Sequence, residues 1–199
     1  MPSNYLVTSS PSDEPERGAV DHHNSINCMT ILKVVFVTLV CSAVASRVAT
    51  AQSAVPRGEP VAGMSCDAME GSRVHIHQHL TILDHGNAVP IPPNVGQPAE
   101  KPCIYWVHTH TPDGIIHIEA PQFRSFTLGD FFAVWGQPLS RTQAAAAHAA
   151  KGQTLRVWVN GTRYTGDPRV IPLAAHADIV IEAGPPFPKP PRFTTWGTL

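Results

Sequence analysis

The stretch Val74-His-Ile-His-Gln-His-Leu-Thr-Ile-Leu83 decides the fold of this 199-residue chain. Successive side chains of a β-strand point to opposite faces of the sheet, and here apolar residues alternate with polar ones. One face of the expected strand carries apolar residues, at Val74, Ile76, Leu80 and Ile82. The opposite face carries three histidines, His75, His77 and His79. The pattern predicts a half-buried strand whose polar face is made of imidazoles.

Two hairpins are predicted around this strand. Asp84-His-Gly-Asn87 is a turn sequence, and residues 88–91 return from it as a short strand that its proline limits to a sheet edge. The second hairpin runs from Ile104 to His110, turns at Thr111-Pro-Asp-Gly114 and returns from Ile115 to Ala120.

The remaining elements complete a mainly β (α+β) fold, an antiparallel sheet of about six or seven strands built from hairpins, with one or two short helices. Each of them is indicated by its apolar period and by the residues that bound it. In chain order they are a helix over 126–139, a second short helix over 143–150, a hairpin over 155–165 that turns at Asn160-Gly161, a strand over 177–183 and an extended Pro-rich tail from Gly184.

The turn of the second hairpin decides which side chains face each other. If Thr111 pairs with Gly114 across a two-residue turn, His108 lies opposite His117. Four polar candidates then share one face: His108, His110, His117 and Glu119. A three-residue bulged turn would instead place His108 opposite Ile118. The first register is favoured, because it alone leaves the other face uniformly apolar.

The histidines predict a transition-metal site on one face of the sheet. Imidazole is the commonest protein ligand for such ions, and a carboxylate completes many of their sites. Copper or zinc is the expected metal, with iron or nickel as alternatives. The candidate ligands are His75, His77, His79, His108, His110, His117 and Glu119.

Several other kinds of site do not fit the sequence. No methionine follows Met69, so Cys103 cannot build the usual blue-copper site. The sequence also lacks the HExxH, CxxC and GxSxG motifs. A cupin site, which uses three histidines and one glutamate, stays an alternative, although its glutamate would fall at Gly114 or Ile115.

Three classes of function follow from this reading. The first is a carrier, buffer or sensor that binds a metal ion. The second is a metalloenzyme with a three-His/one-Glu site and hydrolytic or oxidative chemistry, in which Glu119 serves as ligand or general base. The third is a structural or interaction module whose Pro-rich tail docks on a partner or acts as a spacer.

The composition and the N-terminal sequence bear on partners and compartment. Charged residues make up 15% of the chain and the formal net charge is -1, which argues against nucleic-acid binding. Residues 29–51 have the order of a signal peptide, and the uncleaved alternative would anchor the chain in a membrane. A secreted or periplasmic protein is therefore expected. The predicted organisation is a polar extension over 1–28, the signal over 29–51, a His-rich β domain over 52–184 and the tail over 185–199.

Two cysteines remain in the expected mature chain, Cys66 and Cys103. In an exported domain such a pair predicts a disulfide, which would close a loop of about 37 residues and stabilise the fold by ~3–4 kcal/mol. The alternative is a pair of free, buried thiols.

Three long motifs stand out in the expected mature chain: HIHQHLTI over 75–82, YWVHTHTPDGIIHIEAP over 105–121 and FTLGDFFAVWG over 126–136. With these motifs the chain resembles an uncharacterised family of exported prokaryotic histidine-rich proteins. The resemblance covers roughly residues 66–184. It implies the boundaries of the domain and the importance of the second hairpin, and it implies no particular reaction.

Overall fold

The computed structural model describes residues 57–199. The expected polar extension over 1–28 and the expected signal peptide over 29–51 lie outside these residues. The described part is mostly β, with a single α-helix and a short 3₁₀-helix. Its elements are β1 (Cys66–Asp67), β2 (Val74–Asp84), β3 (Asn87–Ala88), β4 (Ile104–Tyr105), β5 (Val107–His108), β6 (Ile115–Ala120), α1 (Leu128–Trp135), β7 (Gln143–Ala144), β8 (Ala147–His148), β9 (Arg156–Val159), β10 (Thr162–Tyr164), η1 (Pro168–Val170) and β11 (Asp178–Ala183).

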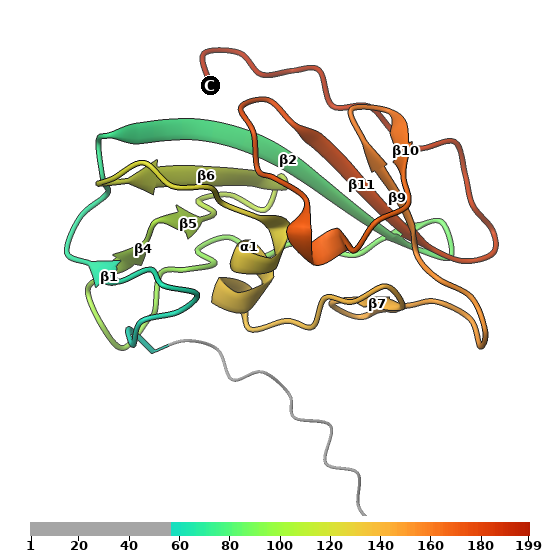
Figure 1. Cartoon of the computed structure of the whole chain (residues 1–199), viewed down its shortest axis with the longest axis horizontal. Coiled ribbons are helices and arrows are strands. Elements are labelled where there is room, and N and C mark those ends of the chain that lie inside the picture. The colour runs from blue at the N-terminus through green and yellow to red at the C-terminus, as the bar shows by residue number, and fades with distance from the viewer. Residues whose placement is uncertain (1–56) are drawn as a thin grey trace, which may run out of the picture. The chain divides into compact units, whose positions relative to one another are not determined.

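The main sheet has seven strands, six of them in the order β10-β9-β11-β2-β6-β5, with β3 paired to β2 (Figure 1). The long strand β2 is its centre, because its first half pairs with β6 and its second half with β11. The predicted mainly β fold is confirmed, with one departure from the expected antiparallel pairing: β11 runs parallel to β2. A parallel neighbour needs a long crossover connection, and here residues 85–177 lie between the two strands.

Different segments of the chain pack against the two faces of the sheet. The helix α1 lies on one face of the sheet (Figure 1). The apolar side chains of β2, β6 and β11 pack there into a core with α1, whose Phe131 and Phe132 are buried. The C-terminal chain crosses the opposite face (Figure 1). The ring of Phe193 in this tail stacks on His79 with centroids 4.0 Å apart. The predicted extended tail therefore forms no strand or helix, and it packs on the domain.

Local sequence explains the bounds of α1. Thr127 and Asp130 form a capping box, in which each side chain accepts a hydrogen bond from the other residue's backbone N–H. Gly136 ends the helix in the left-handed conformation, at φ 69°. The helix predicted over 126–139 is thus confirmed, with shorter bounds.

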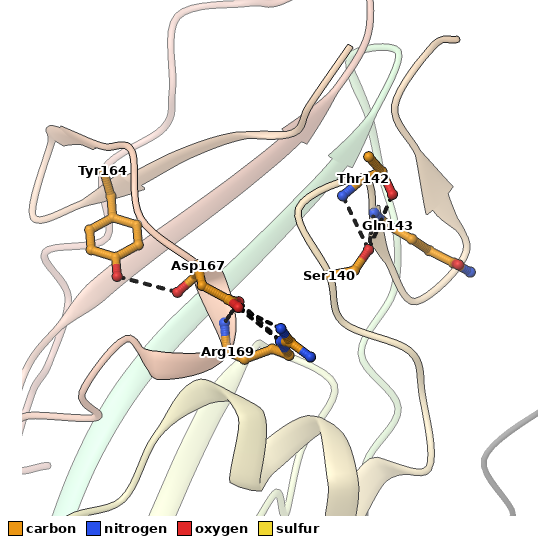
Figure 2. A network of polar contacts seen from close by, with 6 residues as sticks. All are labelled: Ser140, Thr142, Gln143, Tyr164, Asp167 and Arg169. Carbon is orange, nitrogen blue, oxygen red and sulfur yellow. Dashed lines mark hydrogen bonds and ion pairs between the residues drawn. The ribbon is translucent and has the colours of Figure 1, made fainter. Parts of the chain in front are cut away.

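The second helix predicted, over 143–150, is wrong. Residues 143–148 form the hairpin β7–β8, in which Ala144 pairs with Ala147. In the turn before this hairpin, the hydroxyl oxygen of Ser140 accepts hydrogen bonds from the backbone N–H groups of Thr142 and Gln143, at 3.1 Å and 3.0 Å (Figure 2). Both paired alanines are fully buried in the core, so tertiary packing overrides the helical propensity of alanine.

Most other predicted elements agree with the structure. The strand expected over 104–110 is divided at Trp106 into β4, which pairs with β1 in a separate sheet, and β5, which pairs with β6. Asn160 and Gly161 both have positive φ, at 52° and 77°, as the type I′ turn between β9 and β10 requires. The strand expected over 88–91 is reduced to β3, which fits its prolines. The predicted disulfide between Cys66 and Cys103 is confirmed, and it lies beside the β1–β4 pair.

Candidate metal centre

Three neighbouring strands bring histidines together on the face of the sheet that lies opposite α1. On β2, His75 pairs with Glu119 and His77 pairs with His117. On the other side of β6, His108 of β5 also pairs with His117. The predicted two-residue register of this hairpin is confirmed, and the alternative with His108 opposite Ile118 is wrong, because Ile118 pairs with Val107.

We refer to six of these side chains as the His–Glu cluster: His75, His77, His108, His110, His117 and Glu119. The strand alternation that builds it also buries its base, since Ile116 and Ile118 of β6 are fully buried on the core face. The buried members of the cluster include His77, His108 and Glu119, whereas His75 and His110 are exposed. The cluster is therefore a desolvated centre that reaches solvent at two ends.

Four side chains on the β2 side of the cluster could hold a metal ion. One ligand atom from each of His75, His77, His117 and Glu119 lies within 4.8 Å of the others. The Nε2 atom of His75 is 3.0 Å from the Oε1 atom of Glu119, and the rings of His77 and His117 have centroids 4.6 Å apart. Ligands of one Zn²⁺ ion with bonds of about 2.0–2.1 Å lie about 3.3 Å apart, so small side-chain shifts would complete this set.

A second set of four lies on the β5 side, and it consists of His108, His110, His117 and Glu119. The Nε2 atoms of His108 and His110 are 3.1 Å apart, close to the separation of two imidazole ligands on one ion. The Nδ1–H group of His108 donates to the carbonyl oxygen of Tyr105 at 2.9 Å. Because that bond fixes the tautomer, Nε2 of His108 keeps its lone pair, as is typical of a metal-binding histidine.

Burial keeps the central imidazoles neutral. It lowers the pKa of His108 to about 4, assisted by His110, His75 and His77 and opposed by the Tyr105 carbonyl. Burial, together with the neighbouring histidines, lowers the pKa of His117 to about 3, and burial also lowers the pKa of His77. The neutral imidazole is the form that binds metal, so these side chains need not lose a proton at neutral pH.

The carboxylate of the cluster has an acidic neighbour that the sequence did not reveal. Burial and the nearby Glu70 raise the pKa of Glu119, while His75 opposes the shift. The Oε1 atom of Glu70 also lies 3.6 Å from the Nε2 atom of His110. Glu70 precedes β2 in a loop, where no strand period relates it to the histidines. Two carboxylates close together beside neutral imidazoles favour a bound cation.

Two buried atoms of the cluster have no hydrogen-bond partner within the described part of the chain. They are Nδ1 of His117 and Oε2 of Glu119, and each is shielded from solvent. Buried polar atoms are rarely left unpaired, because their desolvation is costly. Both atoms are of the kinds that bind transition metals, so the residues present fit a metal ion.

The structure places His79, the remaining sequence candidate, apart from both sets. Its Nδ1 atom is 3.5 Å from the carboxylate of Asp178 on β11, and its Nε2 atom is 3.1 Å from the carbonyl oxygen of Asp113. Phe193 of the tail covers its ring. The parallel β11–β2 pairing, which local sequence did not predict, is what brings Asp178 beside this histidine.

Comparisons of the chain with protein-family models, with curated proteins and with solved structures returned no match. The chemistry of the His–Glu cluster therefore has to be judged from its own geometry.

Proposed function

We propose that this protein binds a divalent transition metal, Cu²⁺ or Zn²⁺, at the His–Glu cluster. The observation that carries the proposal is the convergence of five imidazoles with Glu119. Two buried atoms of this group, Nδ1 of His117 and Oε2 of Glu119, have no hydrogen-bond partner among the residues that the structure describes. Nitrogen-rich sites with one carboxylate suit both metals, and Cu²⁺ stands above Zn²⁺ in the general order of affinity. Iron and nickel are weaker alternatives.

The position of Glu119 favours binding over hydrolytic or oxidative catalysis. A general base has to reach a substrate or a water molecule, whereas both oxygens of this buried carboxylate face imidazole nitrogens. The distances are 3.0 Å to Nε2 of His75 and 3.8 Å to Nε2 of His108. A carrier or buffer in which Glu119 is a ligand is the function that this geometry supports best.

We place this activity outside the cytoplasm, in the periplasm or the medium. The signal-like pattern over 29–51 supports export, as does the resemblance of the mature chain to exported histidine-rich proteins. The disulfide between Cys66 and Cys103 supports an oxidising compartment. Among the described residues, no helix is both long enough and apolar enough to cross a membrane.

The test is metal content after loading. The purified protein is incubated with Cu²⁺ or Zn²⁺, passed through a desalting column and analysed by mass spectrometry for bound metal. We expect metal to be retained by the wild type and reduced in the His108→Ala, His110→Ala double variant, which removes two ligands of the set on the β5 side. His85→Ala, His148→Ala is the matched control, because it removes two exposed histidines outside the cluster. A wild type that retains neither metal would overturn the proposal.

A further inference from the structure

We infer that the His–Glu cluster holds a pair of metal ions with Glu119 as their bridge. This inference rests on the proposed function and goes beyond it in the number and the linkage of the ions. The inference comes from the two ligand sets described above, which overlap. Each set has two histidines of its own, and both sets contain His117 and Glu119.

The cluster is too wide for one ion. With metal–ligand bonds of about 2.0–2.2 Å, all ligands of an ion lie within about 4.4 Å of one another. The His75–His77 pair and the His108–His110 pair lie on opposite sides of the β6 residues His117 and Glu119. Within the part of the chain that the structure describes, no compact ligand set combines the two pairs.

The strand register places the shared groups between the two outer pairs. The middle strand β6 carries His117 and Glu119 at positions i and i+2, so both side chains rise from the same face. Each side of β6 carries a His-x-His pair with one buried and one exposed imidazole, and on the β5 side the exposed His110 follows the end of the strand. The arrangement thus provides two similar half-sites, each with its own two imidazoles, on either side of a common histidine and carboxylate.

The carboxylate of Glu119 is oriented as a bridge. Its Oε1 atom faces the β2 half-site, 3.0 Å from Nε2 of His75 and 3.6 Å from Nδ1 of His117. Its Oε2 atom faces the β5 half-site, 3.8 Å from Nε2 of His108. One oxygen per half-site is the geometry of a carboxylate that joins two ions, which in two-metal sites lie about 3.5–4 Å apart.

Charge also favours this arrangement. Two divalent ions beside neutral imidazoles need more than one negative charge nearby. Glu70 supplies a second carboxylate at the β5 half-site, 3.6 Å from Nε2 of His110. Together with Glu119, it would offset part of the positive charge of the two ions.

Copper stoichiometry together with electron paramagnetic resonance tests the inference. The wild type is loaded with excess Cu²⁺ and desalted, and its bound copper is counted per chain by mass spectrometry. We expect two copper ions and a resonance signal well below that of two isolated ions, because unpaired electrons on bridged ions couple. Two ions with the full signal would show independent sites and overturn the bridge. One ion would overturn the pair and leave the proposed function standing, whereas none would remove both.

Single variants at exposed positions test each half-site with little risk to folding. His75→Ala and His110→Ala should each weaken the binding of one of the two ions by at least tenfold, because loss of a mere outer-shell partner already costs about 10–100-fold. The copper that remains should give the full signal of an isolated ion. Glu119→Gln should restore the full signal per bound copper. His148→Ala should keep both the count and the coupling. The inference would be contradicted if the two copper ions still couple in Glu119→Gln. It would also be contradicted if neither His75→Ala nor His110→Ala lowers the number of copper ions bound per chain.

Discussion

Replacing Arg192 with alanine is expected to destabilise the domain without affecting metal binding. Arg192 lies in the C-terminal tail and pairs with Asp178, a buried residue of β11 with a side-chain exposure of 3%. Its Nε–H group donates to Oδ2 of Asp178 at 3.0 Å, and the backbone N–H of Phe193 donates to the same oxygen at 3.2 Å. The variant would leave a buried carboxylate with the Phe193 N–H and the more distant His79.

The structure sets the size of the effect. Removing one partner of a fully buried ion pair costs about 3–5 kcal/mol, because the remaining charge is uncompensated. The Arg192 side chain is 51% exposed, so solvent screens part of its interaction with Asp178. The Phe193 N–H stays in place and offsets a further part. We therefore expect a loss of about 2 kcal/mol, which for a domain of this size lowers the Tm by about 4–8 °C.

A double-mutant cycle provides the assay. Urea unfolding is measured on metal-free protein for the wild type, Arg192→Ala, Asp178→Asn and the double variant, so that bound metal does not contribute to stability. When Asp178 is already asparagine, Arg192→Ala should change the free energy of unfolding little. We therefore expect a coupling energy of about 1–2 kcal/mol between the two residues. Additive effects, with a coupling below about 0.5 kcal/mol, would refute the reasoning. Copper uptake by Arg192→Ala should equal that of the wild type.

Three further predictions concern stability. Replacing Cys66 and Cys103 with serine should lower the free energy of unfolding by about 4 kcal/mol, since the disulfide closes a loop of 37 residues, and an unchanged urea midpoint would contradict this. Gly114→Ala should lower the free energy of unfolding by at least about 1 kcal/mol more than Gly152→Ala, as thermal melts of the two variants would measure. Both glycines have positive φ, but of the two only Gly114 would bring an added Cβ against a backbone oxygen, at 2.6 Å. Between pH 7 and pH 5, the protonation of His108 should lower the free energy of unfolding of the metal-free protein by about 2 kcal/mol. The pKa of His108 is about 4 in the folded protein and 6.5 in the unfolded chain, so the unfolded chain takes up the proton first. Urea titrations at the two pH values measure this loss, and equal stability at both would exclude it.

The sequence predicted the part of the fold that depends on strand alternation. A period of two fixes both the face of each side chain and, through the parity of the turn, the register of a hairpin. That was enough to place His108 opposite His117 and to put Glu119 on the same face. Of the seven candidate ligands, His79 alone lies outside the two ligand sets of the structure.

The elements that the sequence missed depend on contacts between distant segments. Nothing in residues 177–183 specifies that this strand pairs in parallel with β2, and this pairing is what places Asp178 beside His79. The alanines over 144–147 favour a helix locally, and they form a hairpin because small side chains fit where β8 packs against β2 and β11. Glu70 lies in a loop, where a carboxylate has no periodic signature.

The two halves of the long strand β2 have different neighbours, so the tail and the candidate metal site do not share one surface. Its second half lies beside β11, and there the tail covers His79 and pairs with Asp178. Its first half lies beside β6 alone, and there His75 stays exposed. An ion can therefore reach the His–Glu cluster from solvent without displacement of the tail. It follows that weakening the tail should change the free energy of unfolding and leave metal uptake unchanged, whereas removing Glu119 should change metal uptake with the tail still in place.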